Sequence, residues 1–238
     1  MTPPGGKAPS WTTPVVGPAP PRTIVGFWHI GAVGDWQRIA AEQWATLKTS
    51  GLYGASEKIV VGFIGGRGQE AELPVPIHDD PRLEAFVTND VRDYEFPTLA
   101  RVWQEARSRV GGYLCYYLHT KGASMAGTHH ERAANAWRKY MEYFTLERWQ
   151  ECRAVLSEYE TCGVELQSED SHYSGNFWWA TSDYVRKLPD AQQYWAEHKE
   201  DRLAAEFYVC QARPKAYCFN DFFENLYDHE ISPEKYRR

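Results

Sequence analysis

Two kinds of hydrophobic pattern alternate along the chain from Arg22 onward. Short runs rich in β-branched and aromatic residues predict strands, and stretches with apolar residues every three or four positions predict amphipathic helices. Such alternation, without an internal repeat, is typical of an α/β fold in which helices flank a mixed, mostly parallel sheet. Strands are expected at residues 23–29, 58–64, 113–118, 163–166 and 174–180, and helices at residues 36–50, 97–110, 129–144, 149–159 and 202–210.

One predicted strand ends in a group of polar side chains. The apolar run at residues 113–118 is followed at once by His119, Thr120, Lys121 and Gly122. Open α/β sheets bind ligands where strands end at their carboxyl side. An imidazole, a hydroxyl and an ammonium at such a point predict an anion site.

The composition restricts what the chain attracts as a whole. Its formal net charge is −6, so it has no general attraction for nucleic acid or for an anionic membrane. A phosphate-bearing ligand therefore needs a local basic site. Aromatic residues make up 15% of the chain, including ten Trp, and such side chains serve core packing as well as stacking on sugars or bases.

Residues 1–21 differ from the rest of the chain. Seven of the fourteen prolines lie there, among Gly, Ser and Thr, and this composition predicts a flexible tail before a single domain at residues 22–238. The longest apolar runs are too short to span a bilayer, no signal-peptide pattern precedes them, and the five Cys show no CxxC spacing. We therefore expect a soluble, cytoplasmic protein with reduced thiols.

Two further segments carry candidate chemistry. In a strand, Asn176 and Trp178 share one face while Phe177 and Trp179 share the other. This pattern fits either a stacking surface for a sugar or base, or a buried strand. Glu206 lies next to the apolar face of the last predicted helix, where a carboxylate can serve as a general base.

Several short segments, taken in their order along the chain, resemble GT-A-type nucleotide-sugar glycosyltransferases of capsule and rhamnan synthesis and of viral glycosylation. The resemblance covers nearly everything after residue 22. The matching segments are Phe27-Trp28-His29-Ile30, Glu42-Gln43, Ser50-Gly51-Leu52-Tyr53, Glu95-Phe96-Pro97-Thr98-Leu99, Tyr117-Leu118-His119-Thr120-Lys121-Gly122, Trp137-Arg138, Gly175-Asn176-Phe177-Trp178-Trp179 and Ala205-Glu206.

The resemblance implies a Rossmann-like, GT-A-like fold with a donor half at about residues 22–125 and an acceptor half at about residues 126–238. It implies a general base at Glu206 and a diphosphate contact at Lys121. The residues implied for donor binding are His29, Glu95, Thr98, His119, Thr120, Lys121 and Arg138. The residues implied for the sugar or the acceptor are Asp170, His172, Asn176, Trp178 and Trp179.

The chain departs from this family at the metal site. GT-A enzymes usually carry an Asp-x-Asp motif after this strand, and here the turn reads His119-Thr120-Lys121. Lys121, helped by Arg138 or Arg202, could take the metal's place as a point charge. Alternatively, Mn or Mg could be held by His119 with Asp170, Asp221 or His229.

The resemblance therefore implies an enzyme that moves a sugar from a nucleoside-diphosphate sugar to a hydroxyl acceptor, either a glycan or a protein-linked glycan. Two alternatives stay open. One is a carbohydrate-binding protein that has kept the transferase fold without its chemistry. The other is a viral-type transferase that glycosylates a modified DNA base. The sugar, the nucleotide, the stereochemical course and the oligomeric state are left open by the sequence.

Overall fold

The computed structural model describes residues 22–66, 68–73, 76, 79–167, 171–199, 201, 203–222 and 224–237. Three predictions lie outside the described residues. These are the flexible tail at residues 1–21, the acceptor or metal ligand Asp170, and the auxiliary cation Arg202.

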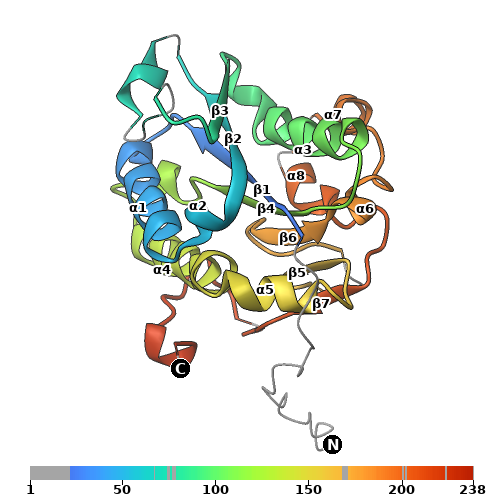
Figure 1. The fold of residues 1–238 in the computed structure, drawn as a ribbon. Helices are drawn as coiled ribbons and strands as arrows, with labels where there is room; N and C mark the ends of the chain where they lie inside the picture. The colour runs from blue at the N-terminus through green and yellow to red at the C-terminus, as the bar shows by residue number, and fades with distance from the viewer. Residues whose placement is uncertain are drawn as a thin grey trace, which may run out of the picture.

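A seven-stranded sheet forms the centre of the molecule (Figure 1). Its strands are β1 (Ile24–Gly31), β2 (Ser56–Ile64), β3 (Leu83–Thr88), β4 (Leu114–His119), β5 (Thr161–Gly163), β6 (Trp178–Thr181) and β7 (Ala216–Cys218). They lie in the order β3-β2-β1-β4-β6-β5-β7. The first four are parallel, β6 runs antiparallel to β4 and β5, and β7 is parallel to β5. The predicted mixed, mostly parallel sheet is thus confirmed.

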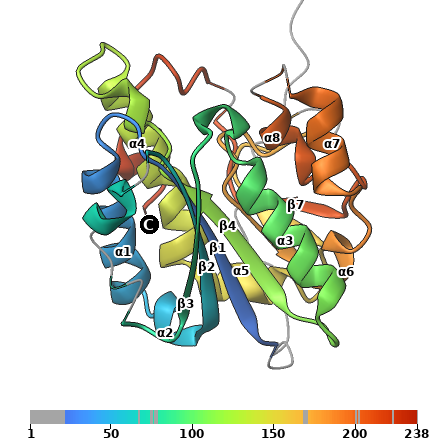
Figure 2. The same ribbon diagram turned by 90° about the horizontal axis from the view of Figure 1, so that it is seen from above.

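Helices cover both faces of this sheet (Figure 2). One face packs against α1 (Trp36–Thr49), α2 (Leu52–Ala55), α4 (Glu131–Glu142) and α5 (Trp149–Val155). The other packs against α3 (Phe96–Ser108), α6 (Ser182–Val185), α7 (Ala191–His198) and α8 (Ala204–Tyr208). Alternation along the strands builds both cores, since Trp28 faces one and Phe27 the other. In the part of the chain that the structure describes, no helix combines the length and the apolarity needed to cross a bilayer.

Some predicted boundaries are wrong for local reasons. Strand β3 was not predicted. It follows a Pro-rich stretch and has one buried residue, Leu83, so its hydrophobic pattern is weak. The strand expected at 174–180 starts only at Trp178, because Gly175 and Asn176 have positive φ values of 89° and 58°. The helix expected at 202–210 is limited to α8 at 204–208.

The order of the strands creates one switch point in the topology. The chain leaves β1 through α1 to reach β2, and it reaches β4 from β3 through α3 on the opposite face. Strands β1 and β4 are neighbours, with His29 opposite His119 at their carboxyl ends. Ligands of open α/β sheets bind in the crevice outside such a point.

Candidate functional site

A cavity of about 620 Å³ opens at this switch point. Its volume lies within the range of small-molecule sites in proteins. It is lined by residues from the ends of β1, β2 and β4, the β3–α3 loop, the turn after β4, α4, α8 and the C-terminal segment: His29, Gly31, Val33, Ile64, Val91, Arg92, Tyr94, Glu95, His119, Thr120, Lys121, Gly122, Ala123, Ser124, Met125, Ala134, Trp137, Leu203, Glu206 and Tyr227.

Both histidines at the strand ends are neutral at pH 7. Burial lowers the pKa of His29 to about 4, and the same cause, reinforced by the nearby Lys121 ammonium, lowers the pKa of His119 to about 4. The Nε2 atom of His119 donates to the carbonyl oxygen of Gly175 at 2.9 Å, which fixes the proton on Nε2. The Nδ1 atom of His119 then faces the Glu95 Oε1 atom at 3.6 Å.

The turn after β4 presents the ammonium of Lys121. Its Nζ atom lies 3.9 Å from the centre of the Trp137 ring, a cation–π contact that orients the side chain. Thr120 ties the two strand ends together, because its Oγ1 accepts from the Gly31 backbone N–H at 3.1 Å. Gly34, with φ 53°, packs directly against this turn, and a Cβ atom there would lie 1.9 Å from the Ala123 carbonyl oxygen.

A carboxylate is held at a fixed place in the cavity wall by two donors. Glu95 immediately precedes α3, and its Oε2 atom accepts from the Tyr117 hydroxyl at 2.8 Å and from the Asn176 amide at 2.7 Å. The Asn176 amide oxygen in turn accepts from the Trp178 indole at 2.9 Å. Asn176 is completely buried, so it positions Glu95 and does not contact a ligand.

The left-handed turn at Gly175 and Asn176 links the groups that face the cavity. Gly175 accepts from His119 through its carbonyl and donates through its N–H to the Glu206 Oε2 atom at 3.1 Å. Asn176 holds Glu95. Gly and Asn adopt positive φ values more readily than other residues, which suits Gly175 and Asn176 to this turn. This turn therefore connects β4, α3 and α8 at one point.

Glu206 and His172 come from the acceptor half predicted from the sequence. Asp201 stabilises the start of α8, because its side chain accepts from the Leu203 N–H at 2.9 Å. Glu206 lines the cavity from this helix. Burial lowers the pKa of His172, although the Glu206 carboxylate acts in the opposite direction. The His172 ring packs 4.4 Å from the Phe207 ring, beside Glu206 and outside the cavity lining.

Besides Asn176 and His172, further residues predicted from their type to bind a ligand do not line the cavity. Trp178 and Trp179 are 1% and 0% exposed and pack into opposite cores, so they offer no stacking surface to a sugar or an acceptor. Thr98 is also fully buried and lies behind His29, whose Nδ1 atom is 3.0 Å from its hydroxyl. Thr98 therefore positions an imidazole of the cavity without lining it.

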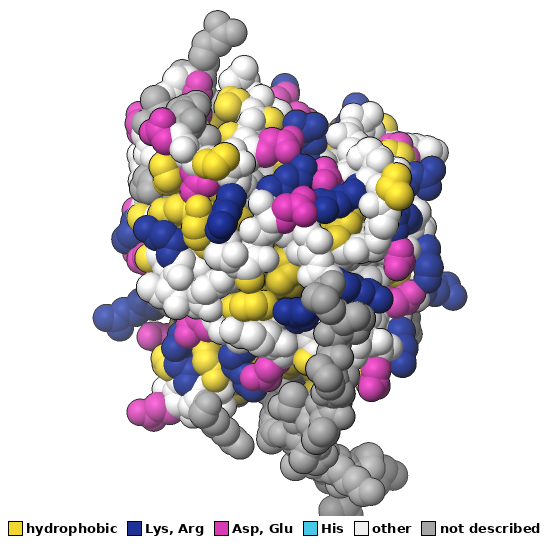
Figure 3. All heavy atoms as spheres, in the orientation of Figure 1, with side chains coloured by type: hydrophobic (Ala, Val, Ile, Leu, Met, Phe, Trp, Pro, Cys, Tyr) yellow, Lys and Arg dark blue, Asp and Glu magenta, His cyan; other side chains and the backbone are white. Residues whose placement is uncertain are grey.

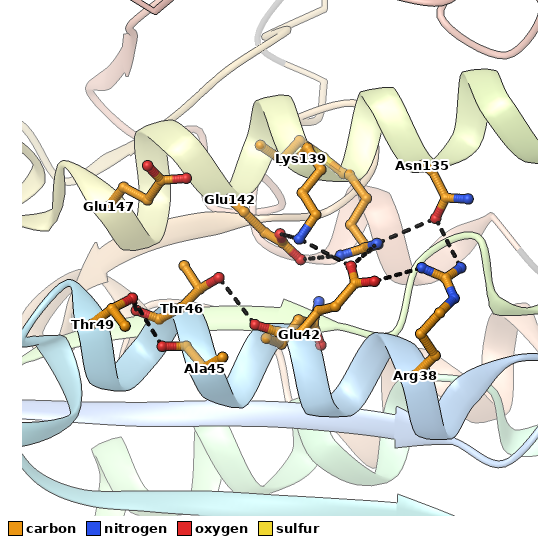
Figure 4. Close-up of polar contacts among 12 residues, drawn as sticks. Arg38, Glu42, Ala45, Thr46, Thr49, Asn135, Lys139, Glu142 and Glu147 are labelled. Carbon is orange, nitrogen blue, oxygen red and sulfur yellow. Dashed lines mark hydrogen bonds and ion pairs between the residues drawn. The ribbon is translucent and has the colours of Figure 1, made fainter. Parts of the chain in front are cut away.

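Arg138, predicted to bind the donor, lies between α4 and α1 and does not line the cavity. Its guanidinium, 1% exposed, contacts Glu142 at 2.7 Å and Glu42 at 2.8 Å. Figure 4 shows Glu42 on α1 pointing toward Lys139 and Glu142 of α4, with Arg38 at its other side. The Arg138 and Lys139 groups hold the pKa of Glu42 down to about 2, although burial acts against them.

The described metal candidates do not come together. His119 lines the cavity, whereas Asp221 interacts with Glu165 and the His229 Nδ1 atom lies 3.1 Å from the Asn225 carbonyl oxygen. Among the described residues, no three His, Cys, Asp or Glu side chains are grouped so that they could hold a metal ion.

Several cavity residues were not predicted as site residues, among them Val91, Arg92, Tyr94, Leu203 and Tyr227. The first three follow β3, so the rule that ligands meet the carboxyl ends of strands would have indicated them if β3 had been recognised. Leu203 lies one helical turn before Glu206. Nothing in the local sequence indicates Tyr227, which reaches the cavity from the C-terminal segment and contacts the Met125 sulfur at 3.5 Å.

Comparisons with known proteins identify a family and, among solved structures, a weak likeness. The search of curated proteins gave no match. Among solved structures, the crystal structure of HddC from Yersinia pseudotuberculosis is similar at a TM-score of 0.45 and 8% identity, over 84% of this chain and 90% of that one. A family model described as "Domain of unknown function (DUF8361)" matches residues 31–224. Since that match covers most of the chain and contains nearly all of the cavity residues, the chain belongs to the DUF8361 family.

Proposed function

We propose that the protein is a glycosyltransferase that moves a sugar from a nucleoside-diphosphate sugar to a hydroxyl acceptor. The observation that carries this proposal is the meeting of an ammonium and a carboxylate, Lys121 and Glu206, in one cavity at the switch point of the sheet. The two groups suit the leaving group and the nucleophile of a displacement at an anomeric carbon. One stabilises a leaving diphosphate and the other accepts the proton of the incoming hydroxyl.

The turn after β4 supplies the end for the diphosphate. His119 and His29 are neutral at pH 7 and contribute no charge there. The cationic side chains among the described lining residues are Lys121 and Arg92, and the Arg92 side chain is 85% exposed and paired with Asp90. Charge developing on a buried diphosphate is therefore stabilised mainly by Lys121, acting as a point charge.

Glu206 supplies the end for the acceptor. Its Oε2 atom is held by the Gly175 N–H, which fixes the carboxylate relative to His119 and the β4 turn. In the proposed step the carboxylate takes the hydroxyl proton while the hydroxyl oxygen bonds to the anomeric carbon. The bond from that carbon to the diphosphate breaks, and its electron pair leaves with the diphosphate.

The formal net charge of −6 and the mixed charges on the face shown in Figure 3 favour a small acceptor or a glycan over duplex DNA. On the face shown in Figure 3, basic and acidic side chains of the described residues are mixed, without a continuous basic stripe. Binding of duplex DNA depends on such a stripe, because phosphate contacts supply most of the affinity. Glycosylation of a modified DNA base is therefore the weaker alternative.

A panel of nucleotide sugars tests the proposal. We expect one of the UDP-, GDP- or dTDP-linked sugars to raise the melting temperature of the full chain, and slow hydrolysis of that donor to follow on incubation. A protein that binds a carbohydrate without transferring it would leave the donor intact. If no member of the panel binds, the proposed function is wrong.

A further inference from the structure

Exposed apolar side chains gather at the mouth of the cavity. Among the described residues, seven large hydrophobic side chains are exposed. Five of these seven line this one cavity: Val33, Val91, Tyr94, Leu203 and Tyr227. Single exposed hydrophobic residues are normal on a protein surface, but their concentration around one opening marks a binding surface.

Three of the five, Val91, Tyr94 and Leu203, form what we call the apolar rim. They are 49%, 40% and 45% exposed. Leu203 lies one helical turn before Glu206, whose backbone N–H donates to the Leu203 carbonyl at 2.9 Å. The Tyr94 N–H donates to the Val91 carbonyl, and Tyr94 directly precedes Glu95. The apolar rim is thus joined through the backbone to both carboxylates of the cavity.

Tyr94 is built into the rim at a conformational cost. Its φ of 47° and ψ of −127° are rare for an aromatic residue, and such backbone strain persists only where packing enforces it. The Tyr94 ring meets the Trp195 ring edge-on at 6.2 Å, and Trp195 stacks on Phe96 at 4.4 Å. Aromatic packing therefore supports a partly exposed ring, which suits a surface that receives another ring.

We infer that the apolar rim is the acceptor subsite, and that the acceptor carries an apolar ring next to its hydroxyl-bearing part, as an aryl glycoside does. This inference rests on the proposed function. A hydroxyl that reaches Glu206 brings the rest of its molecule past Leu203, one turn away on the same helix. The side chains of Val91 and Leu203 offer no hydrogen bond, so an acceptor that is polar all round would lose water there without replacement.

Phenyl β-glucoside and methyl β-glucoside test this inference, because they differ only in the apolar group beside the sugar. Saturation-transfer NMR on the full chain needs no donor. We expect phenyl β-glucoside to bind about tenfold more tightly, and Val91→Ser and Leu203→Ser each to remove most of that preference. Val87→Ser is the matched control, since Val87 is 42% exposed four residues before Val91 and does not line the cavity.

Equal binding of the two glucosides, or unchanged binding in both rim variants, would overturn the inference. Circular dichroism of each variant shows whether it is folded, and the Val87→Ser protein sets the level of change expected from a surface Val→Ser substitution alone. The proposed function fails on a separate result, namely the absence of donor binding in the nucleotide-sugar panel. A protein that binds phenyl β-glucoside at the rim and no donor would keep the subsite and lose the transferase.

Discussion

Two clusters of charge flank helix α4, and they differ in what their charges face. Trp137 and Arg138 are consecutive residues of this helix. Trp137 turns toward the cavity and carries Lys121 on its ring, whereas Arg138 turns toward α1 and contacts Glu42 and Glu142. The charged groups of the cavity, Glu95, Lys121 and Glu206, line about 620 Å³ of open space. The charged groups between the two helices, which we call the α1–α4 network, are Arg38, Glu42, Arg138, Lys139 and Glu142, and they contact one another.

The difference separates charge that holds a fold from charge that is available for chemistry. A buried ion pair is sensitive to the loss of one partner, because the other is left as an unpaired buried charge. A charge that faces a cavity can change partners when a ligand enters. Substitutions in the α1–α4 network should therefore act on stability, and substitutions in the cavity should act on binding and transfer.

The largest expected effect is on folding, from Arg138→Leu. This change leaves the fully buried Glu142 with the more exposed Lys139, at 3.2 Å, as its remaining cation, so the cost should approach, without exceeding, the cost of about 3–5 kcal/mol for breaking a buried pair. Urea unfolding measures the loss. The double variant Arg138→Leu, Glu142→Leu should recover a large part of it, and a single variant as stable as the natural chain would show that the pair does not hold α4.

Glu206→Gln should act on transfer. A glutamine keeps an acceptor for the Gly175 N–H but cannot take a proton, so we expect the transfer rate to fall by about 10²–10³ with donor affinity nearly unchanged. Single-turnover kinetics with the donor found in the panel measure this. Equal transfer by the variant would remove Glu206 from the role of base. The stability of the variant should match that of the natural chain.

Lys121→Ala should weaken donor binding by about tenfold. This factor corresponds to the lower end of the roughly 1.5–3 kcal/mol that one charge-assisted contact contributes. Isothermal titration with the donor and with its free nucleoside diphosphate measures the change. Lys121→Arg serves as control, because it keeps the charge. If both variants bind as tightly as the natural chain, the diphosphate does not lie at the β4 turn.

The smallest effects should separate the two clusters by pH. The buried His119 has a folded pKa of about 4, below its ordinary 6.5, so its contribution to stability is lost as the pH falls from 6.5 through 4. Glu42 has a folded pKa of about 2, below its ordinary 4.5, so its contribution is lost from 4.5 through 2. Urea unfolding across pH should show His119→Gln reducing the pH dependence in the upper window, which His119 shares with the equally buried His29, and Glu42→Gln reducing it in the lower one.

The sequence predicted the mixed, mostly parallel sheet because the hydrophobic patterns of its longer strands are local, and the same local pattern located the polar turn after β4. Strand β4, which ends at His119, consists almost entirely of hydrophobic residues. Its end and the polar turn that follows could therefore be predicted directly from the sequence. The prediction of ligand-binding residues failed where it was based on the type of a residue and not on its position in the fold. Trp178 and Arg138 are residue types that bind sugars and phosphates, yet each is satisfied inside the protein, by Asn176 and by two carboxylates.

The rim was missed for a different reason. Val91 and Tyr94 follow β3, a strand with a weak hydrophobic pattern at the edge of the parallel part of the sheet. Leu203 immediately precedes the short helix α8, and nothing in the local sequence indicates that its side chain is exposed. Exposure depends on the folded arrangement of segments far apart in the chain, and periodicity within one segment contains no information about it.

Gly34 gives a way to judge other members of the family. The space that a side chain at position 34 would fill is occupied by the backbone of Ala123, two residues after Lys121. A relative that keeps the His-Thr-Lys turn but carries a larger residue at position 34 must have displaced that turn or the β1–α1 loop. We therefore expect Gly34 and Lys121 to be kept or lost together. Relatives that have both should keep the anion site at the turn after β4, and relatives that have lost both should use the cavity for another ligand.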